Sequence, residues 1–269
     1  IRSLVAAAMP GIRSDLEDLV RIPSVSRDGP TSPELARSAE AIATLLADAG
    51  MPDVRVLDAE DGAPAVVARI PAPAGAPTVM LYAHHDVQPA GNLADWRSDP
   101  FEPVERDGRL YGRGAADDKA GVMAHVGALR ALQQAYPKGL PVGITVFIEG
   151  EEEIGSPTFA PFLEEYADLL AADVVVIADS SNWEVGIPAF TTSLRGLVEV
   201  FVEVSTHGVE QHSGMYGGLF PDALMGLVRV LAALHDDQGR VAVPGLVHAA
   251  APDVVLDEAS LREEVGVLP

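Results

Sequence analysis

The sequence TVMLYAHHDVQP, residues 78–89, decides the expected fold and holds the first candidate functional residues. Residues 78–82 form an apolar run, which predicts a buried β-strand. Side chains two positions apart in an extended chain share a face, so His84 and Asp86 face the same way. His84 then offers one ring nitrogen to a metal while Asp86 holds the other, although an ordinary hydrogen-bonded loop pair explains the same two residues.

Three later polar segments resemble this one in their position along the chain. They are LYGRGAADDKAG at 110–121, EGEEEIGS at 149–156 and ADSSNW at 178–183. Each lies where a predicted strand gives way to a loop or helix. Ligands of open α/β sheets bind at that edge, so we expect the four segments to meet there.

Together the four segments resemble the carnosinase-like dipeptidases of the di-zinc metallopeptidase family, which includes acetylornithine deacetylase, succinyl-diaminopimelate desuccinylase, aminoacylase and glutamate carboxypeptidase. The resemblance implies metal-dependent hydrolysis of dipeptides or short peptides. It leaves an N-acyl amino acid deacylase as the alternative activity. It also implies an α/β fold with a mixed, mostly parallel sheet covered by helices on both faces.

The resemblance assigns the metal ligands residue by residue. His84 and Asp179 would bind the first metal and Glu153 the second, while the carboxylate of Asp117 would bridge the two ions. A cis peptide bond is implied between Asp117 and Asp118. A further histidine ligand is expected outside the chain, which ends at Pro269 within the lid domain of the family.

The same resemblance assigns three catalytic residues. Glu152 would be the general base, because it precedes the ligand Glu153 and adjacent side chains do not both point at one ion. Asp86 would orient the His84 ring. His212 would reach across a dimer to polarise the scissile carbonyl. Taken alone, the glutamate run at 151–153 is typical of a solvated surface. A single histidine in a loop, such as His212, is also typical of a solvated surface.

Composition limits the cofactors and partners. The chain has no cysteine, so a transition metal must take histidine and carboxylate ligands, and we expect two divalent ions, zinc first with manganese or cobalt as alternatives. A net charge of -22 disfavours nucleic acid and anionic membranes as partners. No apolar stretch reaches the length of a membrane span and no signal peptide is apparent, so a cytoplasmic location is expected.

The chain is expected to contain two domains. Residues 1–189 would form the catalytic domain and 190–269 an incomplete ferredoxin-like α+β lid that carries the contact of a homodimer. Within the lid, the alternation of valine and polar residues predicts a strand over 197–205, and an amphipathic helix is predicted over 221–234. Residues 89–108 are expected to form a long loop. The alternative class is an inactive metal-binding or dimerisation fragment.

Overall fold

We describe the protein from a computed structural model, which covers residues 1–269 except 183–184, 192–193, 195, 247–258, 260–261 and 263–269. The chain divides into two compact units, Ile1–Thr192 and Ser193–Pro269.

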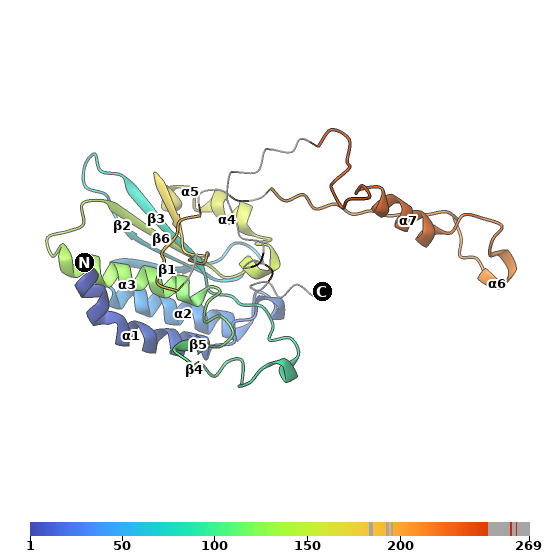
Figure 1. The fold of residues 1–269 in the computed structure, drawn as a ribbon. Helices are drawn as coiled ribbons and strands as arrows, with labels where there is room; N and C mark the ends of the chain where they lie inside the picture. The colour runs from blue at the N-terminus through green and yellow to red at the C-terminus, as the bar shows by residue number, and fades with distance from the viewer. Residues whose placement is uncertain (183–184, 192–193, 195, 247–258, 260–261, 263–269) are drawn as a thin grey trace. The chain divides into compact units, whose positions relative to one another are not determined.

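The first unit is built on a five-stranded sheet with the strand order β1-β2-β6-β3-β7 (Figure 1). Strands β3, β6 and β7 run parallel to one another, whereas β1 and β2 are antiparallel to their neighbours. The strands are β1 (Asp53–Leu57), β2 (Ala65–Ile70), β3 (Thr78–His84), β6 (Gly143–Glu149) and β7 (Val174–Ile177). The expected mixed, mostly parallel sheet is confirmed.

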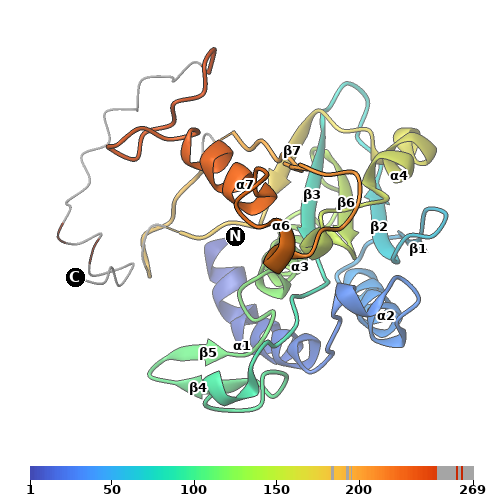
Figure 2. The same cartoon turned by 90° about the vertical axis from the view of Figure 1, so that its right-hand side faces the viewer.

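Helices cover both faces of this sheet (Figures 1 and 2). On one face, buried side chains of three long helices pack with Val146 and Ile148. On the other, Phe147 stacks on Phe162, with ring centroids 5.3 Å apart. The first set is α1 (Arg2–Val20), α2 (Pro33–Asp48) and α3 (Lys119–Ala135), and the second is α4 (Phe159–Glu165) and α5 (Ala167–Leu170). Because β6 is covered on both sides, all seven of its residues are buried.

The strand register brings the expected site segments to one edge of the sheet. His84 at the end of β3 pairs with Glu149 at the end of β6, and Tyr82 pairs with Ile177 at the end of β7. Since the three strands are parallel, the residues that follow them emerge at the same edge. The sheet therefore positions residues after 84, 149 and 177 next to one another.

A hairpin begins within the expected long loop. Strands β4 (Val104–Arg106) and β5 (Arg109–Tyr111) pair across Asp107 and Gly108, whose φ angles are 52° and 77°. Two central residues with positive φ make the tight turn that suits the twist of a hairpin, and Asp-Gly is its usual sequence. The prediction of a loop throughout 89–108 was therefore wrong for the first strand of this hairpin.

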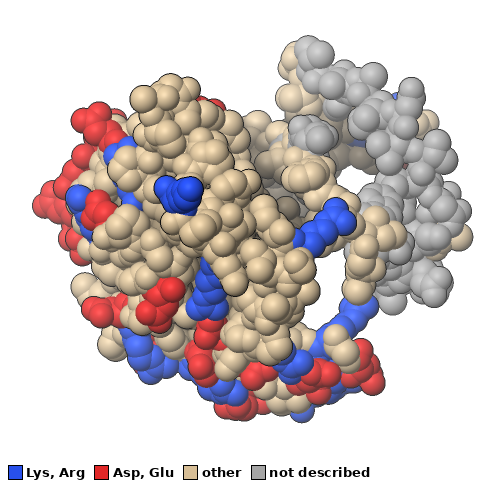
Figure 3. All heavy atoms as spheres, turned by 90° about the vertical axis from the view of Figure 1, so that its left-hand side faces the viewer, with Lys and Arg blue, Asp and Glu red and all other residues tan. Residues whose placement is uncertain are grey.

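The described surface carries both signs of charge. Figure 3 shows acidic and basic side chains interspersed in small groups on one face of the molecule. The ion pairs of Arg13 with Glu17 and of Arg21 with Glu102 are of this kind, and such exposed pairs contribute little stability. None of the helices in the described part of the chain is long and apolar enough to span a membrane.

Among its described residues, the second unit has the helices α6 (Ser213–Tyr216) and α7 (Ala223–Ala232). Helix α7 confirms the predicted amphipathic helix, and Asp222 caps it by accepting a hydrogen bond from the backbone N–H of Met225 at 2.8 Å. The predicted strand over 197–205 is wrong: the segment is irregular, and no described segment pairs with it. Alternating valines need a neighbouring strand to satisfy their backbone groups.

Candidate metal centre

His84 lies at the centre of the carboxylate cluster. It ends β3 and is fully buried. Its Nε2 atom is 3.1 Å from Oδ1 of Asp117, which belongs to the loop before α3, and 3.9 Å from Oδ2 of Asp179, two residues after β7. Asp117 and Asp179 follow His84 by 33 and 95 positions in the sequence, and all three side chains converge at the edge that the parallel strands define.

The side chains form two groups that fit a divalent ion. One group is His84, Asp117 and Glu153, and the other is His84, Asp118 and Asp179; in each, the donor atoms lie within 4.8 Å of one another. Imidazole nitrogen and carboxylate oxygen are the ligands that zinc and similar ions take in the absence of thiolates. Carboxylates gathered this closely repel one another unless a cation lies among them. All four expected metal ligands are therefore brought together.

Asp118 is the member of these groups that the sequence did not single out. It is 1% exposed, and its Oδ2 atom accepts a hydrogen bond from the backbone N–H of His84 at 3.1 Å. Burial, with the charges of Asp179 and Asp117, raises the pKa of Asp118 to about 7, although the His84 contact opposes the rise. The peptide bond between Asp117 and Asp118 is cis. Asp118 thus forms a donor group with His84 and Asp179, and Asp117 forms one with His84 and Glu153.

Asp86 holds the other nitrogen of the His84 ring. Its Oδ1 atom is 3.3 Å from Nδ1 of His84, and its backbone oxygen is 3.0 Å from the same nitrogen. This arrangement places the proton of the neutral ring on Nδ1 and leaves Nε2 for a metal. Burial alone lowers the pKa of His84, but the hydrogen bond and charge of Asp86 outweigh it and raise that pKa to about 10. A metal ion at Nε2 must therefore displace a proton.

Three successive glutamates follow β6, and the structure separates their roles. Glu151 is buried, and its carboxylate accepts hydrogen bonds from the backbone N–H of Thr158, at 3.0 Å, and from the Thr158 hydroxyl. Glu152 and Glu153 lie in the short 3₁₀ turn Glu152–Ile154 and face His84. The Oε2 atom of Glu152 is 3.8 Å from Nε2 of His84. Glu151 is thus structural, and the other two belong to the site.

Burial raises the pKa of Glu152, and the nearby charges of Asp179 and Glu153 add to the rise, although the charge of His84 opposes it. A raised pKa brings a carboxylate closer to the range in which it exchanges protons at neutral pH. This electrostatic environment suits a general base.

His85 lies on the opposite side of the chain, as expected. It is fully buried, and its Nε2 atom donates to the carbonyl oxygen of Pro64 at 2.8 Å. Burial lowers the pKa of His85 to about 4, so its ring is neutral. The neighbouring histidines therefore have different environments, and only His84 faces the carboxylates.

Lys119 is a second residue that the sequence did not single out. Its side chain is fully buried, and Nζ donates to the backbone oxygens of Leu19 and Ile22, at 2.8 and 2.6 Å. Burial lowers the pKa of Lys119 to about 7. The amine ties the end of α1 to the start of α3, directly after Asp117 and Asp118. No periodic pattern in the sequence reveals such a contact.

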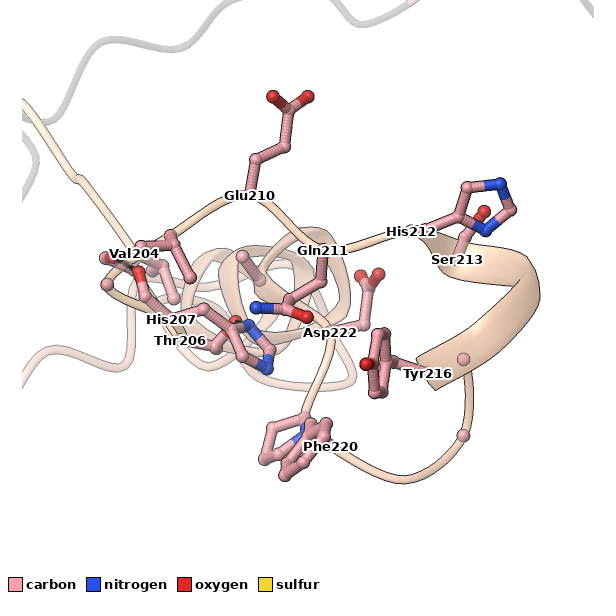
Figure 4. Close-up of a pocket in the computed structure, with 17 residues that line it drawn as sticks. Val204, Thr206, His207, Glu210, Gln211, His212, Ser213, Tyr216, Phe220 and Asp222 are labelled. Carbon is pink, nitrogen blue, oxygen red and sulfur yellow. Dashed lines mark hydrogen bonds between the residues drawn. The ribbon is translucent and has the colours of Figure 1, made fainter.

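His212 belongs to the second unit. It precedes α6, is exposed, and accepts a hydrogen bond at Nδ1 from the backbone N–H of Gly214 at 3.1 Å. It contributes to a cavity of about 500 Å³ that is lined by residues 204–213, 216–218 and 220–223. Figure 4 shows its ring directed away from His207 and Phe220.

The fold and the donor cluster define an α/β protein with a carboxylate-rich candidate metal site. A family model described as "Peptidase family M20/M25/M40" matches residues 80–251, and the chain belongs to this family. The resemblance inferred from the four sequence segments is confirmed.

Named relatives agree with this assignment. The chain is 44% identical over 172 residues to a cysteinylglycine-S-conjugate dipeptidase of Corynebacterium striatum and 36% identical over 196 residues to the Beta-Ala-His dipeptidase of Rattus norvegicus. These alignments cover 64% and 71% of this chain, but only 37% and 39% of the relatives. The crystal structure of human carnosine dipeptidase 1 is similar with a TM-score of 0.69 and 26% identity, over 98% of this chain and 60% of that one.

Proposed function

We propose that the protein hydrolyses dipeptides or other short peptides with the help of two divalent metal ions, zinc being the expected metal. The observation that carries the proposal is the convergence of His84, Asp117 and Glu153, with Asp179, at the carboxyl edge of the parallel strands. The names of the relatives, which are dipeptidases, support the substrate class.

The metal ligands proposed here are His84 and Asp179 for the first ion and Glu153 for the second, with Asp117 shared. Bound ions of this kind polarise a carbonyl and lower the pKa of a water molecule towards about 7. His84 contributes Nε2, because Asp86 holds Nδ1 in the ring.

Glu152 is proposed as the general base and acid. Its carboxylate takes a proton from water as the water oxygen adds to the scissile carbonyl carbon. The C–N bond then breaks, and Glu152 delivers the proton to the leaving amine nitrogen, which yields an amine and a carboxylic acid. The raised pKa of Glu152 supports this exchange.

His212 is proposed to donate to the carbonyl oxygen of a substrate bound by the other subunit of a homodimer. The proposed division is a catalytic domain over 1–189 and a lid over 190–269, and the separation into units at Thr192 supports it. A cytoplasmic location is part of the same proposal and rests on the sequence alone.

A substrate panel tests the proposal. The intact protein is treated with chelator, supplied with zinc, manganese or cobalt, and assayed on Cys-Gly, β-Ala-His and N-acetyl amino acids. Metal-restored cleavage of the dipeptides is expected. Cleavage of N-acetyl amino acids alone would replace the dipeptidase assignment with the deacylase alternative, and no cleavage of any of them would contradict hydrolysis of this class.

A further inference from the structure

Glu152 and Glu153 have similar surroundings, although different roles are proposed for them. They are adjacent carboxylates in one short turn and both face the His84 side of the site. Asp86 holds their backbones in the same way, because its Oδ1 and Oδ2 atoms accept hydrogen bonds from the N–H groups of Glu152 and Glu153, each at 3.1 Å. Charge and backbone support therefore do not distinguish them, although only Glu153 joins His84 and Asp117 in a donor group of the described residues.

Gln88 distinguishes the two side chains. Its Nε2 atom donates to the backbone oxygen and to the Oε2 atom of Glu153, both at 2.8 Å. Gln88 lies four residues beyond the end of β3, on the same loop as Asp86. One amide group thus holds the carbonyl and the carboxylate of Glu153 together, which fixes the side chain relative to its own backbone.

Glu152 has no such partner. Within the described part of the chain, its carboxylate accepts no hydrogen bond, and its nearest ionic contact is the one with His84 at 3.8 Å. A carboxylate without a fixed donor is free to rotate between a water molecule and a leaving amine. One held at a single oxygen keeps its other oxygen in a constant direction for an ion.

We propose that Gln88 is a positioning residue that makes Glu153 the metal ligand and leaves Glu152 as the mobile base. The inference deepens the proposed function and rests on it for the roles of the two glutamates. Removing a partner that orients a metal ligand typically weakens metal binding about 10- to 100-fold. Gln88 is therefore expected to act on metal affinity, although it touches neither the substrate nor the ion.

The variant Gln88→Met in the intact protein tests the proposal, because methionine has a similar length and no N–H donor. Zn²⁺ affinity is measured by competition with a chromophoric chelator. We expect one of the zinc ions to bind about 10- to 100-fold more weakly. Gln88→Asn keeps the amide but is one methylene shorter, so it should show the same loss of Zn²⁺ affinity. This variant replaces Gln88→Met in the test if Gln88→Met does not fold.

Gln133→Met is the matched control. Gln133 on α3 also donates from Nε2 to a backbone oxygen, that of Gly50, at 3.1 Å and remote from the glutamates. If Gln88 only stabilised the backbone of the turn Glu152–Ile154, Gln88→Met would lower the melting temperature of the metal-free protein. It would leave Zn²⁺ affinity at the value of the control variant. That result would overturn the proposal.

Double variants assign the effect to one glutamate. In a Glu153→Gln background, Gln88→Met should cost no further Zn²⁺ affinity, whereas in a Glu152→Gln background the full loss should persist. An equal loss in both backgrounds would contradict the proposal. Zinc binding is measured without a substrate, so a protein whose zinc affinity depends on Gln88 and Glu153 but which cleaves no peptide would reject the proposed function alone.

Discussion

The imidazole of His84 lies 3.1 Å from the carboxylate of Asp117, although 33 positions of the sequence separate them. Parallel pairing of β3 with β6 and β7 produces the edge at which they meet. The cluster is therefore a product of the sheet topology. Its chemistry depends on which of the surrounding carboxylates bind an ion and which exchange protons.

Exchange of each glutamate for glutamine should separate these two roles. Glu152→Gln removes the proposed base, so turnover should fall about 10²- to 10⁴-fold while the metal content stays at the wild-type level. Glu153→Gln removes a ligand and should lower the metal content. Metal analysis and dipeptide hydrolysis on the same preparations check both statements. Equal metal loss in the two variants would show that the roles are assigned wrongly.

The buried ring of His85 predicts a pH dependence of stability. Its pKa is lowered to about 4 by burial, whereas an unfolded histidine titrates near about 6.5. As the pH falls from about 6.5 to 4, the unfolded chain takes up a proton that the folded chain excludes, so stability falls by up to about 1.4 kcal/mol per pH unit.

The variant His85→Gln isolates this contribution, because glutamine keeps an N–H donor for Pro64 but does not titrate. Urea unfolding of the chelator-treated protein at several pH values measures it. The difference in stability between wild type and variant should shrink or reverse in favour of the variant below about pH 6.5. A constant difference between pH 4 and 7 would show that His85 has the same pKa in the folded and unfolded states.

Gly150, which precedes the three glutamates, packs closely against the ring of His85. A Cβ atom at Gly150 would lie 2.6 Å from the backbone oxygen of Pro64 and 2.8 Å from Nε2 of His85. Gly150→Ala should therefore destabilise the protein by about 1–3 kcal/mol.

Gly11 in α1 provides the matched control, because a Cβ atom there would meet nothing within 4 Å. Gly11→Ala should stabilise the helix by about 0.5–1 kcal/mol. Thermal unfolding of both variants measures the two shifts. If they had the same sign, the close approach at Gly150 would not govern its stability effect.

The sequence predicted strands of the sheet because apolar runs are a local pattern, whereas the metal ligands were assigned from the family resemblance and remain a proposal. The apolar run at 78–82 lies within β3, which extends to His84. The candidate site segments lie directly after strands, and the hydrophobic pattern also indicates where those strands end. The Asp-Gly turn between β4 and β5 carried a local signal that was not used.

Other features depend on tertiary contacts that no pattern encodes. Asp118 faces the site through its contact with the backbone of His84, and Gln88 reaches Glu153 across 65 positions. The alternating valines at 197–205 predicted a strand, but alternation specifies only a face and not a partner. The segment lacks a neighbour among the described residues and remains irregular.

The most direct test of the central claim compares two adjacent histidines. His84→Gln removes the proposed ligand, whereas His85→Gln alters an imidazole that faces away from the carboxylates. Metal content by mass spectrometry and dipeptide hydrolysis are measured on both variants of the intact protein after equilibration with zinc. The account predicts that His84→Gln loses bound zinc and activity and that His85→Gln retains both. Wild-type zinc content and activity in His84→Gln would contradict it.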